Sequence, residues 1–173
     1  MTNVTIATRD HVTEQASGLA ALLQATVQDG GAIGFVLPLP DDDARDFWRS
    51  IAEDVEHGRR VLFLAEVDGA LAGSVQLIAE LPPNQPHRSE VAKLMVHPDF
   101  RRRGVASALM RALEAHARAL GKTLITLDTR TGDSAETLYA ALGFETAGVI
   151  PNYALDPDRQ NTHATTYMFK QLD

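Results

Sequence analysis

One segment of the sequence combines the residue types that hold a phosphorylated cofactor. After an apolar strand candidate come three arginines, 101–103, and Gly104 then opens a helix candidate. The N-terminus of a helix exposes free backbone N–H groups and the positive end of the helix dipole. Gly104 and the small Ala106 let a bulky anion approach that backbone, and the arginines add positive charge. The segment Arg101–Ala106 therefore predicts a pyrophosphate cradle. The alternative is a capped helix after a solvated turn.

Two other phosphate-binding patterns are excluded by the same residues. No Gly-Lys-Ser/Thr follows the glycine, as a P-loop requires, and a dinucleotide fingerprint needs more glycines than the single Gly104. The net charge of −7 argues against nucleic-acid binding, which usually leaves a basic footprint. A small phosphorylated cofactor fits this segment better than a polynucleotide.

Two carboxylates lie inside strand candidates. Glu90 begins the strand Ser89–Val96, and Asp128 ends the strand Thr123–Thr129. A carboxylate in an apolar or β-branched strand is costly unless it is paired or functional, and an amine must lose a proton to a base before it can attack a carbonyl. Both carboxylates are therefore acid–base candidates. The alternatives are that Glu90 faces solvent and that Asp128 caps a turn. Strict alternation along the first strand predicts that Glu90 shares a face with Ala92, Leu94 and Val96.

A second motif follows on the next strand–helix unit. Tyr139 and Gly143-Phe144 stand in the pattern Ala-x-x-Leu-Tyr-x-x-x-Gly-Phe, which begins at Ala135. With both motifs in this order, the chain from about Val61 to its end resembles the Gcn5-related N-acetyltransferase family. The resemblance implies an enzyme that uses acetyl-CoA as co-substrate, held in a cleft between two splayed parallel strands.

The resemblance also assigns residues to that cofactor. Backbone groups of Leu94, Met95 and Val96 are expected to pair with the pantetheine arm. Many family members carry an asparagine seven residues before the motif tyrosine, where this chain has Gly132, and Ser134 is expected to substitute for that contact. The expected cofactor-binding residues are Leu94, Met95, Val96, Arg101, Arg102, Arg103, Gly104, Val105, Ala106 and Ser134.

A narrower similarity concerns the tabtoxin-resistance acetyltransferases, which acetylate the amine of a small β-lactam toxin. It rests on sequence around Glu90, on Leu-Asp-Thr at Asp128, and on Gly-x-Ile-Pro-x-Tyr ending at Tyr153. Carried over residue by residue, it implies that Glu90 and Asp128 are the acid–base carboxylates and that Tyr139 is the acid for the departing sulfur. A half-buried structural tyrosine is the alternative for Tyr139. No nucleophilic residue is needed, so we expect direct transfer in a ternary complex, and the histidines show no metal-ligand spacing.

We expect the acceptor to be a small-molecule amine, a class that includes antibiotics and toxins. We expect Phe35, in the flexible segment Gly31–Phe35, and Tyr153, in a polar loop Pro151–His163, to contact it; an ordinary helix connection is the alternative for the first segment. A protein N-terminal or lysine acetyltransferase and a non-catalytic acyl-CoA sensor are the competing functions. The two carboxylates and the tyrosine favour an enzyme.

The elements that must position these residues follow from periodicity and turn signals. Apolar spacing predicts helices, alternating or β-branched runs predict strands, and Asp68-Gly69 predicts a hairpin. The order is β-α-α-β-β-β-α-β-α-β-β, a mixed α/β sheet covered by helices. The expected strands are Val4–Ala7, Val61–Val67, Leu71–Leu81, Ser89–Val96, Thr123–Thr129, Glu145–Ile150 and Thr165–Leu172. The expected helices are Glu14–Gln28, a second that follows Pro40 and closes at Gly58, Val105–Leu120 and Ser134–Leu142.

Length and composition complete the expectations. The 173 residues fit a single domain over 1–173. The absence of cysteine excludes disulfides and a cysteine nucleophile, and neither a secretory signal nor a membrane-spanning run is visible. We therefore expect a cytoplasmic protein with no membrane or nucleic-acid partner. Many relatives of this fold dimerise, so the resemblance also admits a homodimer.

Overall fold

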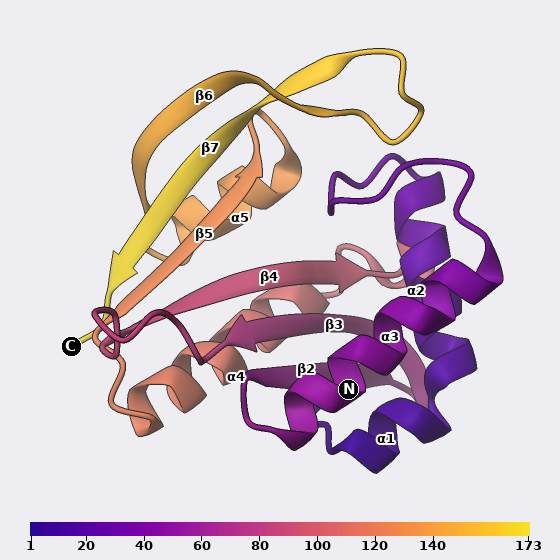
Figure 1. The fold of residues 1–173 in the computed structure, drawn as a ribbon, viewed down its shortest axis with the longest axis horizontal. Helices are drawn as coiled ribbons and strands as arrows, with labels where there is room; N and C mark the ends of the chain where they lie inside the picture. The colour runs from indigo at the N-terminus through magenta and orange to yellow at the C-terminus, as the bar shows by residue number, and fades with distance from the viewer.

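A computed structural model describes all residues 1–173, in which one twisted sheet carries helices on both faces (Figure 1). The sheet has seven strands in the order β1-β2-β3-β4-β5-β7-β6. The strands are β1 (Thr2–Ile6), β2 (Arg60–Val67), β3 (Ala70–Ile78), β4 (Arg88–Val96), β5 (Leu124–Arg130), β6 (Glu145–Leu155) and β7 (Thr162–Gln171). The helices are α1 (Arg9–Glu14), α2 (Ala16–Gln28), α3 (Asp41–Glu56), α4 (Val105–Ala119) and α5 (Ser134–Ala141), with a short 3-10 turn at Pro98–Phe100.

The predicted mixed α/β sheet is confirmed. The strand pair β4 and β5 is parallel and every other pair of neighbouring strands is antiparallel. Helix α4 makes the crossover between β4 and β5, as a parallel pair requires. The hairpin predicted at Asp68-Gly69 joins β2 to β3, with both residues at positive φ.

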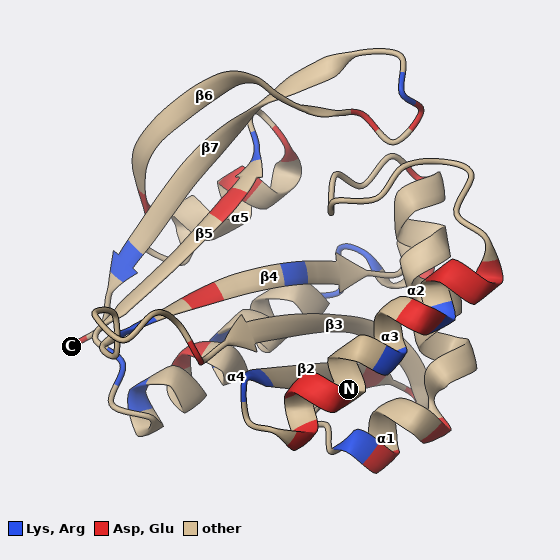
Figure 2. Ribbon diagram, viewed as in Figure 1, with Lys and Arg blue, Asp and Glu red and all other residues tan.

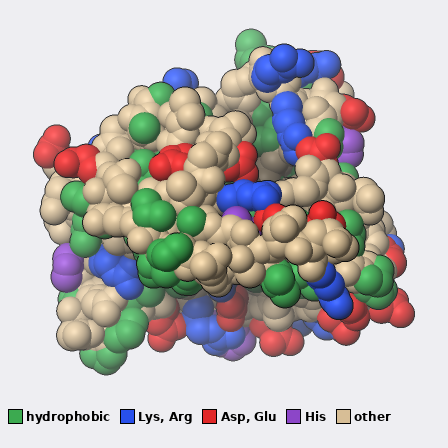
Figure 3. Space-filling view, turned by 90° about the horizontal axis from the view of Figure 1, so that it is seen from above, with side chains coloured by type: hydrophobic (Ala, Val, Ile, Leu, Met, Phe, Trp, Pro, Cys, Tyr) green, Lys and Arg blue, Asp and Glu red, His purple; other side chains and the backbone are tan.

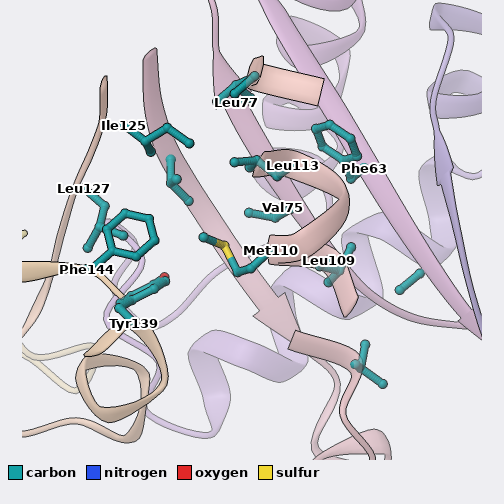
Figure 4. Packing of buried hydrophobic residues seen from close by; sticks show 14 of the residues in the cluster. Phe63, Val75, Leu77, Leu109, Met110, Leu113, Ile125, Leu127, Tyr139 and Phe144 are labelled. Atoms are coloured by element: carbon teal, nitrogen blue, oxygen red, sulfur yellow. The ribbon is translucent and has the colours of Figure 1, made fainter. Parts of the chain in front are cut away.

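Two apolar cores lie on opposite faces of the sheet. One packs α4 against β2, β3 and β5 around Phe63, Leu113 and Ile125 (Figure 4). The other packs α1, α2 and α3 against the opposite face around Leu23 and Trp48. Trp48 is 1% exposed and donates its indole N–H to the Leu19 carbonyl at 2.8 Å, so it belongs to this core. The two cores fix the sheet on which the site is built.

Helix α1 was not predicted from the sequence. Thr8 and His11 form a capping box that begins it, and it ends after Glu14 at the C-cap Gln15. Its one buried residue is Val12, so six residues with a single apolar contact leave no periodic signal. The predicted helix Glu14–Gln28 corresponds to α2 alone.

The predicted loop Pro151–His163 is wrong for most of its length. Strand β6 continues through Pro151 to Leu155, and β7 begins at Thr162. Proline is tolerated here because β6 is an edge strand that pairs with β7 alone. The remaining turn, residues 156–161, joins the two long strands. None of the five helices has the length and apolarity needed to cross a membrane.

Candidate active site

A cleft opens where β4 and β5 stop pairing. The two strands are hydrogen-bonded through Arg88–Glu90 and Leu124–Thr126 only, and β5 then continues beside β7. Beyond Glu90, the β5-facing edge of β4 has no strand partner, and Figure 1 shows the two strands diverging from this point. The cleft has a volume of about 1360 Å³. Its walls also include the α2–α3 loop and the N-termini of α4 and α5.

A β-bulge at Lys93 changes which side chains of β4 face the cleft. Gln76 pairs with Ala92 and Ser74 pairs with Met95, so two residues of β4 oppose one residue of β3. Lys93 takes φ +53, a left-handed conformation that one type of β-bulge adopts at its first residue.

The bulge corrects the expectation that Glu90, Ala92, Leu94 and Val96 share a face. Leu94 and Val96 pack toward the α4 core, whereas Met95 is buried in the core of α1–α3. The extra residue reverses the alternation, so Glu90 lies on the same side as Met95.

The N-terminus of α4 carries the predicted cradle. The backbone N–H groups of Arg102 through Ser107 donate to no acceptor within the protein. Gly104 caps the helix at φ +78, and a Cβ built on it meets no atom within 4 Å, so the backbone is open to a ligand. A run of free amides at a helix N-terminus is suited to a phosphate group.

The three arginines do not act alike. Arg101 is ion-paired with Asp29 at the end of α2, and both residues line the cleft. Arg102 also lines it. Arg103 does not: its guanidinium lies over the Phe100 ring, 5.5 Å from the ring centre. The prediction that all three arginine side chains lie at the cradle is corrected for Arg103, whose guanidinium stacks on Phe100, while its backbone N–H remains one of the free amides of the cradle.

These features fit a coenzyme A thioester. The free edge of β4 offers unpaired backbone groups to an extended amide-bearing arm, and the amides of 102–107 offer donors to a pyrophosphate. The cleft volume exceeds the usual ~300–1,000 Å³ of a small-molecule pocket, which leaves room for a second substrate. Each of Leu94, Met95, Val96, Gly104, Val105, Ala106 and Ser134 lines the cleft.

The two predicted carboxylates lie in the cleft but in different environments. Glu90 accepts a hydrogen bond from Arg88, with Nη1 and Oε2 3.2 Å apart. Asp128 has no ion pair, and the hydrogen bond that acts on its carboxylate comes from its own backbone. Burial, and after it the negative charge of Glu90, raises the pKa of Asp128, while the nearby Lys93 lowers it. The raised pKa makes the Asp128 carboxylate a better proton acceptor than an ordinary aspartate.

Tyr139 is almost fully buried, at 5% exposure, on α5. Its ring packs against Phe144 with centres 5.7 Å apart, as Figure 4 shows beside Leu127. It lines the cleft, and burial followed by the charges of Asp128 and Asp133 strongly raises the pKa of its hydroxyl. The hydroxyl therefore stays protonated and can donate a hydrogen bond into the cleft.

The predicted acceptor residues line the same cleft. Phe35, in the α2–α3 loop, packs edge-on against Phe47 of α3 with ring centres 5.1 Å apart. Tyr153, on β6, shares a hydrogen bond with the Tyr167 hydroxyl at 2.8 Å. Ser134 begins α5, where its N–H donates to the N-cap Asp133 at 2.6 Å. All three predicted residues face one space.

Three further residues contribute to the site and were not predicted from the sequence. Lys93 and Arg60 line the cleft, and Tyr167 pairs in register with Asp128 across β5 and β7. The hydrogen bond between the Tyr167 and Tyr153 hydroxyls, then burial, raises the pKa of Tyr167 to about 12. A hydrophobic strand pattern does not predict a bulge at Lys93. Tyr167 can be assigned to the site only once the strand register is known. No group of three or more metal-ligating side chains is present.

Comparisons with known proteins agree with this geometry. The profile of the acetyltransferase (GNAT) family matches residues 19–144. An uncharacterized N-acetyltransferase in the hisH-hisA intergenic region of Azospirillum brasilense is 32% identical over 133 residues, covering 75% of this chain and 77% of that protein.

Solved structures share the fold at lower identity. An N-acetyltransferase from Staphylococcus aureus superposes with a TM-score of 0.82 at 19% identity, covering 100% of this chain and 99% of that one. The acetyltransferase yncA from Salmonella typhimurium, solved with acetyl-CoA, superposes with a TM-score of 0.80 at 18% identity, covering 100% of this chain and 95% of that one. The chain belongs to the acetyltransferase (GNAT) family, is an enzyme, and uses acetyl-CoA as its co-substrate.

Proposed function

For this member of the acetyltransferase (GNAT) family, we propose direct transfer of the acetyl group of acetyl-CoA to a primary amine of a small molecule. One observation carries the proposal: the cleft that contains the free edge of β4 and the free amides of 102–107 also contains an unpaired carboxylate, Asp128. Acetyl-CoA supplies the activated acetyl group as a thioester. The protein then has to bind it, orient the amine and move protons.

Asp128 is the proposed base. Its raised pKa brings its proton affinity closer to that of an amine, and its carboxylate is free to accept a proton. Glu90 is held by Arg88, so its proposed role is to raise the pKa of Asp128 and to attract the ammonium form of the acceptor. The two carboxylates thus act in sequence, Glu90 in binding and Asp128 in deprotonation.

Tyr139 is the proposed acid. It keeps a proton on its hydroxyl at the wall of the cleft because ionisation there is opposed by burial and by the charge of Asp128. Backbone groups of Leu94 and Met95, beside the bulge, are the proposed contacts to the pantetheine arm. Ser134, Arg101 and Arg102 are proposed to support the phosphates from the helix termini.

A small acceptor is favoured over a protein because the cleft is bridged. The Leu37 N–H donates to the Pro157 carbonyl at 2.7 Å, joining the α2–α3 loop to the β6–β7 turn. Arg130 extends the bridge by donating to the Gly30 carbonyl at 3.3 Å and by pairing with Asp156. Figure 1 shows the α2–α3 loop and the β6–β7 turn facing each other on the same side of the molecule. A protein acceptor would need this bridged part of the cleft to be an open groove.

The similarity to the tabtoxin-resistance acetyltransferases extends the proposal to detoxification. Phe35 and Tyr153 are then proposed to contact an antibiotic-like or toxin-like acceptor. The proposal includes a single domain over residues 1–173 and a cytoplasmic location, where acetyl-CoA is available. It also includes a homodimer as the assembly, in which the exposed edge strand β6 is free to pair.

A pair of glycine variants tests the cofactor site. Gly104 and Gly58 both have positive φ, and in both a Cβ meets no atom within 4 Å. Gly104→Val and Gly58→Val therefore carry a similar backbone penalty, of about 1–2 kcal/mol, but only the first places a side chain in the cradle. We expect Gly104→Val to weaken acetyl-CoA binding by at least about tenfold in calorimetry, whereas Gly58→Val binds like the wild type. Equal affinities in the two variants would contradict the cradle, and binding without amine-dependent thiol release would favour the sensor.

A further inference from the structure

We propose that the acceptor is a zwitterion, an amine that carries a carboxylate close by, and that Lys93 binds this carboxylate. The inference rests on the proposed function and names the substrate class of that site. Lys93 belongs to the acceptor side of the cleft: a Cβ on Gly34 would lie 3.1 Å from its Nζ, and the Nζ lies 5.7 Å from the centre of the Phe35 ring. Both neighbours belong to the α2–α3 loop.

Apart from its contact with the Phe35 ring, Lys93 is a cation without a hydrogen-bond or ion-pair partner. It is half-buried, donates no hydrogen bond, and has no carboxylate oxygen within 4.0 Å of its Nζ. The two other lysines are both satisfied, Lys122 by two backbone carbonyls and Lys170 by Glu114 and a carbonyl. An unpaired charge held in a partly desolvated wall is costly, so the wall is better suited to a bound anion than to an empty cleft.

Opposite charges face each other across the cleft without touching. Asp128 is near enough to Lys93 for each to shift the pKa of the other, yet they form no ion pair. Figure 2 shows one basic and one acidic segment on β4 and an acidic segment on β5, and Figure 3 shows acidic and basic side chains next to one another near the middle of the molecule seen from above. A zwitterion with its carboxylate on Lys93 and its ammonium toward Asp128 and Glu90 pairs every one of these charges.

The neighbouring cations do not compete for this role. Arg60 is held by Asp54 and by the Gln76 side chain, and Arg88 is held by Glu90. Burial, followed by the charge of Arg60, lowers the pKa of Lys93, and an anion bound beside it would oppose that shift. Lys93 is the one free cation on the acceptor side.

Binding measurements with matched ligands test the inference. In the presence of coenzyme A, the standard L-α-amino acids and their carboxamides are titrated into the wild type by calorimetry. We expect at least one amino acid to bind about ten- to a hundredfold more tightly than its amide, the range for one charge-assisted hydrogen bond. Lys93→Gln should reduce this ratio to near one, whereas Lys93→Arg should retain it. Arg49→Gln, which removes one exposed charge on α3, controls for the change in net charge.

The outcomes separate this inference from the proposed function. An acid preference that depends on Lys93, without acetyl transfer to any amine, would support the zwitterion site and refute the transferase proposal. Acetyl transfer to amines together with equal affinity for acids and amides would support the transferase proposal and refute the zwitterion site. The inference is also overturned if Lys93→Gln leaves the ratio unchanged, or if no amino acid binds to the folded wild type.

Discussion

Gly73 links the packing of the sheet to the cofactor cleft, so its replacement by alanine is an informative perturbation. It lies on β3 opposite Val96, and a Cβ there would come 2.5 Å from the Met95 carbonyl and 3.3 Å from side chains of Val105 and Leu109. Contacts of a real Cβ stay above 3.0 Å, so β3 and β4 must separate by about 0.5 Å at Met95. That displacement falls beside the bulge and under the N-terminus of α4.

We expect Gly73→Ala to cost about 1–3 kcal/mol, as overpacking of a core does, and to lower Tm by roughly 2–12 °C. Because the displaced backbone borders the cleft, the KM for acetyl-CoA should rise by up to about tenfold. The matched control is Gly18→Ala on the exposed face of α2, where a Cβ makes an ordinary 3.6 Å contact with Leu71. That change should stabilise by about 0.5–1 kcal/mol and leave the KM unchanged. A Gly73→Ala variant with the Tm and KM of the wild type would refute this account of the packing.

Three further predictions concern the titratable groups. Asp128 must be deprotonated to act and its pKa is raised, so the activity of the wild type should fall as the pH drops through that raised pKa. Because Glu90→Gln removes one cause of the shift, the acidic limb of the pH–rate profile of this variant should move to lower pH. An unmoved limb would mean that another group is the base. Tyr139→Phe should keep acetyl-CoA binding and lower kcat by about 10²–10⁴-fold, measured by thiol release, and an unchanged kcat would exclude it as the acid. Tyr153→Phe removes the main cause of the raised pKa of Tyr167, which should fall from about 12 toward 10 in an ultraviolet titration, and a value still near 12 would contradict the hydrogen bond.

Most residues that line the cofactor half of the cleft could be predicted from the sequence because their signals are local. A strand end, a glycine and a helix start are adjacent in the chain, so the cradle at Gly104 follows from its own neighbours. The fold class was likewise readable from periodicity and from the hairpin at Asp68-Gly69. Arg103 was misplaced because the direction of a long side chain depends on a tertiary neighbour, Phe100.

The acceptor half was less predictable because it depends on register. The bulge at Lys93 reverses the alternation of side chains between the two faces of the sheet along β4, and no residue type in this strand predicts a bulge. Tyr167 joins the site through its strand pairing with Asp128, a residue far from it in the sequence. The extension of β6 through Pro151 was missed because a proline signals a break unless the strand is known to be an edge.

The central claim is that this cleft transfers an acetyl group to an amine with Asp128 as the base. The most direct measurement is thiol release from acetyl-CoA by wild type and Asp128→Asn over a panel of small amines, with acetyl-CoA affinity determined in parallel. We predict amine-dependent release by the wild type and a loss of about 10²–10⁴-fold in the variant at unchanged acetyl-CoA affinity. Equal release by the two proteins, or no release from the wild type with any amine, would contradict the claim.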